Sequence, residues 1–471
     1  MRLSSPTGSR RHAPPRWPVL ALAAALAGCA GLTPQDARLP DAPVPATWST
    51  GNSTTAPATP LAQWWQRLGD AQLTALVEQA LAANTSVRTA QAALQQARAQ
   101  VDVQAAGLAP QLGASASAQR SRSGNSGTGN SFQLGFDASW EPDVFGRVRA
   151  GVNASEADAR AAEASLADVQ VSLAAEVAVN YIELRSLQQR LAIAQSNLAS
   201  QGETLQITQW RLQAGLTTSL VAEQARAASE QTAAQIPALE ASLAQSRHSL
   251  AVLTGQAPAA LDAQLAASAA VPQAPEGLAL AIPAETLRQR ADVRAAEQRV
   301  RAALARVSQA EAARYPDFGI SGSVGLRALT LGALSGGSAV AASLLGSVSV
   351  PLLDGGANRA QVRAQEASLE QARIAYQAAV LAALKDVEDA LVSLRGNRER
   401  LVRLTAAADA AGNAALLAQQ RYRSGLIDFQ AVLETQRTLL STQDGVATTV
   451  ASVSADHVRL YKALGGGWQP Q

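Results

Sequence analysis

The stretch WEPDVFGRVRA at residues 140–150 recurs in outline as VPLLDGGANRA at residues 350–360, and the similarity continues to residues 227 and 437. A shift of 210 positions brings landmarks of the first copy onto the second: Gly146/Gly356, Arg149/Arg359, Val177/Val387, Leu184/Leu394, Leu191/Leu401, Arg211/Arg421 and Gly215/Gly425. A self-match at one fixed period indicates that one structural unit occurs twice. This unit is far longer than the roughly 20–50 residues of solenoid repeats, so it is half of the protein.

The centre of the unit predicts an unusually long helix. Residues 146–214 contain no proline, and between Gly146 and Gly215 the only glycines are Gly151 and Gly202. At about 1.5 Å per residue such a helix is about 100 Å long. Valine or leucine recurs at every seventh position: Val177, Leu184, Leu191, Leu198, Leu205 and Leu212. A heptad of this length predicts coiled-coil packing of these side chains between helices, rather than a pore-lining role.

Turns and a return helix complete the helical part. Gly215 ends the first long helix, and residues 217–254 predict an antiparallel return with a kink at Pro237. The second copy predicts a long helix over 357–423, a turn at Gly425 and a return helix to Leu464.

Alternating segments precede each long helix. An apolar series alternates with polar residues on either side of a Gly/Ser/Asn loop at 121–131: Leu112, Ala114, Ala116 and Ala118, then Phe132, Leu134, Phe136, Ala138 and Trp140. This pattern predicts a β-hairpin over 111–140 in which each strand has one apolar face. About ten residues per strand is the length of a membrane-spanning strand. A second hairpin is expected at 317–351, with its loop at 332–338.

These elements predict a mainly α fold with a β-barrel part, built from two tandem repeats of helix, β-hairpin, very long helix, turn and helix. Four strands in one open sheet would leave unpaired edges in lipid, so oligomerisation must close the sheet. Three copies give twelve strands, and four copies are also possible from this arithmetic. The expected boundaries are a first repeat at 63–256 (helical hairpin 146–254), a linker at 257–284, a second repeat at 285–464 (helical hairpin 357–464) and a tail at 465–471.

The first 28 residues predict a cleaved secretory signal, because four arginines precede an apolar stretch at 17–27 that is too short to span a bilayer. The stretch ends in Leu26-Ala27-Gly28-Cys29, which is similar to the lipobox of bacterial lipoproteins. An ordinary signal with a chance cysteine is the alternative. We expect a covalent lipid such as palmitate on Cys29, followed by a proline-rich tether at 29–62. No aspartate follows Cys29 directly, which favours the outer membrane.

Composition excludes several classes of function. The chain has 39 Lys and Arg against 37 Asp and Glu, but four of the arginines precede Cys29. The mature chain therefore carries a net charge of −2, with no basic run that would bind nucleic acid. A single cysteine leaves no disulfide or thiolate metal site. We find no nucleophile elbow, Walker-type loop, HExxH or acidic calcium loop, so we expect neither an enzyme nor a metal or cofactor beyond the lipid.

Four segments carry a resemblance, which extends over the whole mature chain, to TolC-like outer-membrane factors in the NodT or OprM-like lipoprotein branch that serves tripartite efflux pumps. They are the opening signature from Trp64-Trp65 to Asn84, the strand-to-helix turns at 140–149 and 351–360, and the start of the second repeat at 282–297. The chain departs from the family pattern at Ala291, where proline is usual, and at Pro142, where an apolar residue is commoner.

The resemblance implies a homotrimer whose twelve strands form a barrel in the outer membrane and whose helices cross the periplasm. It implies a passive exit duct for small toxic compounds or drugs, docked on a periplasmic adaptor and an inner-membrane transporter of the resistance-nodulation-division type. A channel for type I protein secretion and a non-pore periplasmic coiled-coil lipoprotein scaffold are alternatives. The lipobox disfavours the first, and the β-hairpins disfavour the second.

The resemblance also places the periplasmic entrance at the two helix tips. It assigns the turns and adaptor docking to Arg211, Gly215, Leu216, Arg421, Gly425 and Leu426. The family's constricting carboxylate corresponds to Glu434, nine residues after Gly425, and Gln430 takes the place of another constricting residue. Three Glu434 side chains would form a ring that favours cations, whereas the alternative is a surface acid paired with Arg437.

Two further residues at the second tip complete the expected gate. We expect Tyr422 and Arg423 to form hydrogen bonds between the two helical hairpins, with simple surface packing at the turn as the alternative. The first repeat has Gln224 in the place of Glu434, so the acid belongs to the second hairpin alone.

Overall fold

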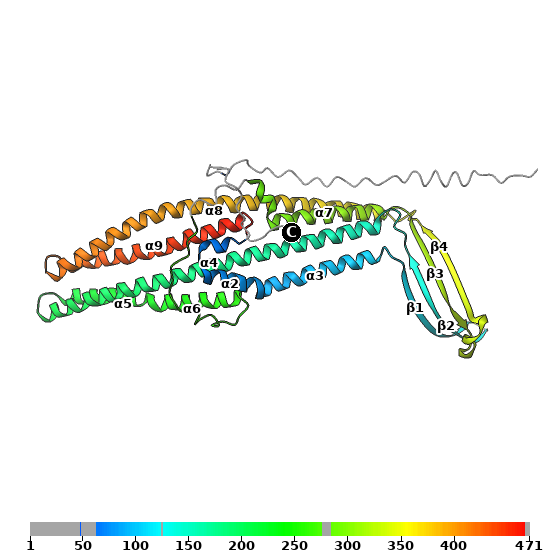
Figure 1. Cartoon of the computed structure of the whole chain (residues 1–471), viewed down its shortest axis with the longest axis horizontal. Coiled ribbons are helices and arrows are strands. Elements are labelled where there is room, and N and C mark those ends of the chain that lie inside the picture. The colour runs from blue at the N-terminus through cyan, green and yellow to red at the C-terminus, as the bar shows by residue number, and fades with distance from the viewer. Residues whose placement is uncertain (1–47, 49–62, 124–125, 276–283, 467–471) are drawn as a thin grey trace, which may run out of the picture.

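The computed structural model describes residues 48, 63–123, 126–275 and 284–466. The predicted signal, Cys29 and nearly all of the tether lie outside the described residues. The molecule is elongated, with the strands at one end and the tips of two helical hairpins at the other (Figure 1). Among the described residues, none of the helices combines the length and the hydropathy that a membrane span requires.

Both repeats share the order helix, β-hairpin, very long helix, turn and return helix, although the shorter elements around them differ (Figure 1). The first consists of η1 (Trp64–Leu68), α2 (Ala71–Ala83), α3 (Thr85–Ala106), β1 (Gln111–Ser123), β2 (Ser126–Trp140), α4 (Arg147–Gln213), α5 (Ser219–Ala233) and α6 (Gln235–Leu253). The second consists of η2 (Ala284–Gln289), α7 (Ala291–Ala312), β3 (Asp317–Ala328), η3 (Leu331–Ser335), η4 (Gly337–Ala339), β4 (Val340–Ser349), α8 (Ala357–Arg423) and α9 (Phe429–Ala463). The break between α5 and α6 lies at Ala234, close to Pro237.

The strands of the first hairpin are longer than the sequence predicts. Residues expected in a loop at 121–131 continue the antiparallel ladder, with Arg120 opposite Asn130 and Arg122 opposite Thr128. Strands β1 and β2 therefore have 13 and 15 residues rather than about ten. Small Gly, Ser and Asn side chains do not obstruct backbone pairing, so a composition typical of loops is here compatible with a strand.

The two hairpins join into one antiparallel sheet in the order β1-β2-β3-β4. One row of paired residues across the sheet is Ala114, Phe136, Val324 and Ala342, and the neighbouring row on the other face is Ser115, Gly135, Gly325 and Ala341. Most of the large apolar residues therefore lie on one face, and the other face is mainly Ser, Gly and charged residues, with Leu345 as an exception. Gly325 has no room for a side chain, because a Cβ there would lie 2.5 Å from the Leu134 carbonyl oxygen.

The polar face carries its own hydrogen bonds. Ser115 donates to the Asp137 carboxylate at 2.7 Å, and the hydroxyls of Ser323 and Ser343 are 2.8 Å apart. The apolar face remains uncovered in the single chain, with Phe136 55% exposed and Leu344 83% exposed.

In each repeat, the residue that precedes α3 or α7 forms a hydrogen bond to the last residue of the return helix. Asn84 donates to the carbonyl of Leu253, the last residue of α6, at 2.8 Å. Arg290 donates in the same way to Ala463, the last residue of α9, at 2.8 Å. The second repeat, expected to open with a helix at residue 285, has its first α-helix only from Ala291: Ala284–Gln289 form a 3₁₀ turn, and Arg290 has a ψ of 140° outside the helical range.

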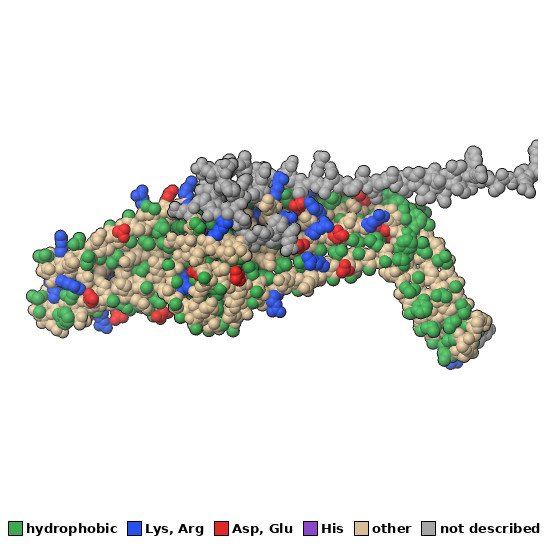
Figure 2. Space-filling model, in the orientation of Figure 1, with side chains coloured by type: hydrophobic (Ala, Val, Ile, Leu, Met, Phe, Trp, Pro, Cys, Tyr) green, Lys and Arg blue, Asp and Glu red, His purple; other side chains and the backbone are tan. Residues whose placement is uncertain are grey.

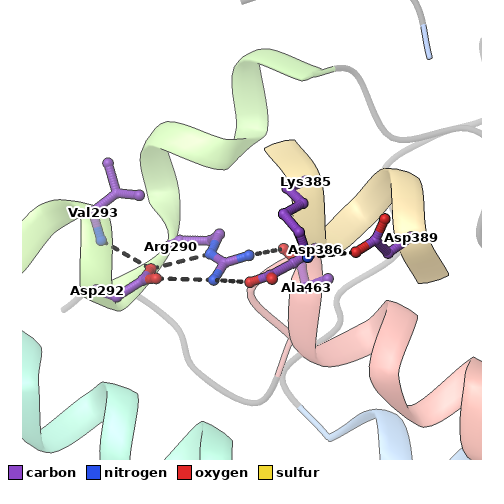
Figure 3. Close-up of polar contacts among 7 residues, drawn as sticks. All are labelled: Arg290, Asp292, Val293, Lys385, Asp386, Asp389 and Ala463. Carbon is purple, nitrogen blue, oxygen red and sulfur yellow. Dashed lines mark hydrogen bonds and ion pairs between the residues drawn. The ribbon is translucent and has the colours of Figure 1, made fainter. Parts of the chain in front are cut away.

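In the second repeat, this contact also includes charged side chains. Figure 3 shows Arg290 between Asp292 and Asp386, with nitrogen–oxygen distances of 2.9 and 3.1 Å. Burial lowers the pKa of Arg290, but the hydrogen bonds to both carboxylates outweigh it and hold the pKa above its ordinary value. The guanidinium therefore stays charged and ties α7, α8 and the end of α9 together.

The buried contact between α4 and the second hairpin changes character along its length. Near the middle of the molecule, Tyr181, Ile182 and Leu184 are buried in one cluster with Ala455 and Val458 of α9. Towards the tips, the buried residues of α4 are Ala194, Asn197, Gln201, Thr204 and Thr208. These positions are spaced by three and four, so they form the actual heptad seam.

The leucines of the heptad run are not equally buried along α4. Within the single chain Leu184 is fully buried, Leu198 and Leu205 are half-buried, and Leu212 is 36% exposed. Leu191 and Leu205 still pack against buried apolar clusters, as the prediction of helix–helix packing requires, whereas Leu212 is exposed within the single chain. A straight helix drifts relative to a strict seven-residue repeat, so one run of leucines does not stay on one face.

Candidate gate at the helix tips

The two helix tips have the same turn. Gly215 and Gly425 have φ angles of 71° and 73°. In each, the residue after the glycine donates back to a carbonyl four residues before the glycine: Leu216 to Arg211 at 2.7 Å, and Leu426 to Arg421 at 2.9 Å. Nothing lies within 4 Å of a Cβ built on either glycine, so the left-handed backbone is what requires glycine there.

Tyr422 is the centre of the contact between the tips. Its side chain is 3% exposed, and its hydroxyl lies 3.1 Å from the hydroxyl of Thr208 on α4. Phe429 packs edge-on against the ring at 6.0 Å. The Tyr422 hydrogen bond therefore joins the first helical hairpin (α4–α6) to the second (α8–α9).

Arg211 also contacts Tyr422, through both its ring and its backbone. Its guanidinium lies 4.7 Å from the centre of the Tyr422 ring and donates to the Tyr422 carbonyl at 2.9 Å. The combination of a cation over an aromatic face and a charged hydrogen bond favours one placement of the second tip. Arg211 was predicted as a turn and docking residue, and it lies in the contact between the hairpins.

Two polar contacts flank Tyr422. Arg423 forms an ion pair with Glu203 of α4 at 2.9 Å, and both side chains are at least half exposed. Gln430 donates to Gln224 of α5 at 3.2 Å. The structure thus brings Tyr422, Arg423 and Gln430 together at the boundary between the two hairpins.

Glu434 lies apart from these contacts. It is exposed on α9, and within the described residues no hydrogen bond or ion pair of its carboxylate is found. Arg437, the partner in the surface alternative, lines a hollow of about 560 Å³ together with Gln201, Gln235 and Asp444. The single chain therefore does not show the Glu434–Arg437 pair.

The remaining predicted tip residues lie on the outside. Arg421 is exposed, and Leu216 and Leu426 are 69% and 74% exposed. Trp210 and Leu220, which no sequence pattern indicated, are 57% and 65% exposed at the same end. Figure 2 shows basic side chains and scattered hydrophobic ones at this end of the molecule.

Sequence reasoning missed Thr208 and Glu203, the α4 partners of Tyr422 and Arg423. The signal for Thr208 was present, since Gln201, Thr204 and Thr208 keep the spacing of three and four that marks a packed stripe. These residues are polar, so the stripe is less evident in the sequence than the neighbouring run of leucines. The described part of the chain holds no group of three His, Cys, Asp or Glu side chains placed to bind a metal.

Comparison with known proteins identifies the fold. The family model described as outer membrane efflux protein matches residues 76–256 and 282–466. Outer membrane protein OprJ of Pseudomonas aeruginosa is 31% identical over 96% of this chain and 96% of its own length. The probable outer membrane lipoprotein SilC of Salmonella typhimurium is 29% identical over 94% of this chain and 96% of its own.

A solved structure of the outer-membrane channel OprN superimposes with a TM-score of 0.85 at 35% identity, covering 92% of this chain and 100% of that one. This likeness confirms the predicted TolC-like fold class. The matching family consists of outer-membrane transport proteins. This confirms the prediction that the protein belongs to the outer membrane and the prediction that it is not an enzyme. The chain belongs to the outer membrane efflux protein family.

Proposed function

We propose that three copies of this chain form the passive exit duct of a tripartite efflux system, which carries small toxic compounds or drugs to the exterior. The observation that carries the proposal is one sheet with an apolar face and two unpaired edge strands, β1 and β4, joined directly to helices about 100 Å long. Unpaired edges are not stable in lipid, and neighbouring copies supply the missing partners. Three copies give an even-numbered ring of strands within the known range.

The partners in this proposal are a periplasmic adaptor and an inner-membrane transporter of the resistance-nodulation-division type. The exposed leucines Leu216 and Leu426, with Arg421 beside them, offer apolar and basic contacts to an adaptor at the tips. A lipid on Cys29 adds a second attachment to the outer membrane. The name of SilC, a probable outer membrane lipoprotein, supports this expectation.

The gate in this proposal has two parts. Tyr422, Arg423 and Gln430 hold the second hairpin against the first through the contacts with Thr208, Glu203 and Gln224. Glu434 supplies the constriction, and its lack of an ion partner in the described residues supports this role. Three unpaired carboxylates around one axis would attract cations and repel anions.

The test is single-channel recording in planar bilayers. We expect Glu434→Ala to raise conductance, because it removes bulk and charge at the narrowest point. Glu434→Gln should weaken the preference for cations with a smaller change in conductance, because the side chain keeps its size. Glu223→Ala removes another exposed acid, on α5, and serves as the control with conductance unchanged. Unchanged conductance and selectivity in both Glu434 variants would refute the constriction.

A further inference from the structure

The strands place their charged residues unevenly. The described strands contain five: Arg120, Arg122, Asp137, Asp317 and Arg327. The register puts both acids and Arg327 on the polar face, in line with Ser115 and Gln133. Arg120 and Arg122 instead follow Leu112, Ala114, Ala116 and Ala118 on the apolar face.

The two arginines lie at the outer end of this apolar face. Arg120 is eight residues beyond Leu112, which is about 26 Å along the strand at about 3.3 Å per residue. An apolar band of about 25 Å is typical of strands that cross the outer membrane. Trp140, opposite Ile320, marks the end nearer the helices and donates to the Leu108 carbonyl at 3.0 Å. Tryptophan is enriched at such membrane boundaries.

Within the described residues neither arginine has an acidic partner. Both are exposed, and no ion pair or side-chain hydrogen bond of either is found. Asp137 faces the other side and already accepts from Ser115. In Figure 2 the visible face of the sheet carries hydrophobic side chains, and basic colour shows only at its far end.

The spacing suits a ligand with more than one negative charge. Residues two apart on a strand point to the same face about 7 Å from each other. Arginine binds phosphate through paired, charge-assisted hydrogen bonds. A phosphomonoester on a lipid headgroup carries close to two charges, and the headgroups of the outer leaflet lie where the apolar band ends.

We propose that Arg120 and Arg122 form a binding site for a lipid of the outer leaflet whose headgroup carries phosphomonoesters. The inference rests on the proposed function, because the apolar face must contact lipid. The site fixes the depth of the strands in the membrane by pairing two guanidinium groups with headgroup phosphates at the edge of the apolar band.

The test compares the R120Q/R122Q double variant with wild type and with Arg327→Gln as full-length, detergent-solubilised proteins. Arg327 lies at the same end of the sheet on the opposite face, so it is the matched control. Diphosphoryl lipid A is titrated into each protein, and bound lipid is counted by native mass spectrometry. We expect wild type and Arg327→Gln to bind alike and the double variant to bind about tenfold more weakly. Phosphatidylglycerol and dephosphorylated lipid A should bind weakly to all three.

Three results would overturn the inference: equal binding of lipid A by the double variant, equal loss in Arg327→Gln, or equally tight binding of phosphatidylglycerol by wild type. Conductance in planar bilayers separates this failure from failure of the channel itself. A conducting double variant with weak lipid A binding supports the site. A conducting double variant with unchanged binding overturns the site alone, and a wild-type protein that never conducts overturns the proposed function and the site with it.

Discussion

The contact between α4 and the second hairpin has an apolar half and a more polar half. In the half nearer the sheet, Tyr181, Ile182 and Leu184 lie in an apolar cluster with Ala455 and Val458. In the half nearer the tips, pairs of side-chain amides and hydroxyls cross the seam beside a smaller apolar cluster that contains Phe429, Val432 and Leu433. The pairs there are Asn197 with Gln443 at 2.9 Å, Thr204 with Gln436 at 3.0 Å and Thr208 with Tyr422 at 3.1 Å. Arg190 and Asp444 mark the change with a 2.7 Å ion pair.

This difference determines where the two helical hairpins resist separation from each other. Apolar burial loses its full stabilisation when water enters, at about 25 cal/mol per Å². A hydrogen bond between side chains is exchanged for bonds to water, so its net contribution is only about 1 kcal/mol. The polar half therefore separates at lower cost than the apolar half. This gradient runs along single helices, so one helix is fixed at its middle and adjustable at its tip.

Removing a fully buried apolar side chain should have the largest effect. Leu184→Ala should lower the free energy of unfolding by about 2–5 kcal/mol, because it leaves a cavity at a fully buried position. Leu212→Ala changes the same residue type in the same heptad run at a position that is 36% exposed. Its loss should stay below about 1 kcal/mol. Denaturant unfolding of the detergent-solubilised protein, followed by circular dichroism, measures both, and equal losses would contradict the comparison.

The contact between Tyr422 and Thr208 should show an effect of middle size. Tyr422→Phe removes the hydroxyl and should cost about 1 kcal/mol, because Thr208 still donates to the Thr204 carbonyl at 2.8 Å and is not left unpaired. The same change should also raise conductance in planar bilayers if this contact holds the tips together. The control is Tyr422→Phe in a Thr208→Val background, where the cost should largely vanish. A cost that persists there would assign it to packing of the ring instead.

Much of the fold could be predicted because its signals are long and repeated. Gly146, Gly215, Gly356 and Gly425 all lie at helix ends, and α8 spans the predicted residues 357–423. Proline breaks the interior of a helix and glycine weakens it, so the absence of proline over the 67 residues of α4, with only Gly151 and Gly202 inside them, carries the prediction almost alone. The strand lengths around Arg120 and Asn130 were missed because small polar residues are as common in loops as at strand ends.

The contacts between the hairpins could be predicted only in part. Tyr422 and Arg423 lie at the boundary of the hairpins, and their partners on α4 depend on how two helices are rotated about their axes. That rotation follows from packing over the whole length of α4, and it brought Thr208 rather than Leu205 or Leu212 into the seam. A local sequence pattern does not contain it. The role of Glu434 depends on neighbouring copies, so it stays a prediction.

The ion pair between Arg423 and Glu203 should show the smallest effect. Both side chains are at least half exposed, with relative accessibilities of 50% and 62%, so water and salt screen the attraction. Exposed pairs typically contribute about 0.2–1 kcal/mol. A double-mutant cycle of Arg423→Ala and Glu203→Ala in low salt should give a coupling energy in this range, and about 1 M salt should abolish it. The Tyr422–Thr208 coupling joins neutral, buried hydroxyls and should be unchanged by the same salt. If salt weakened both couplings equally, the polar half would depend on charge rather than on buried hydrogen bonds.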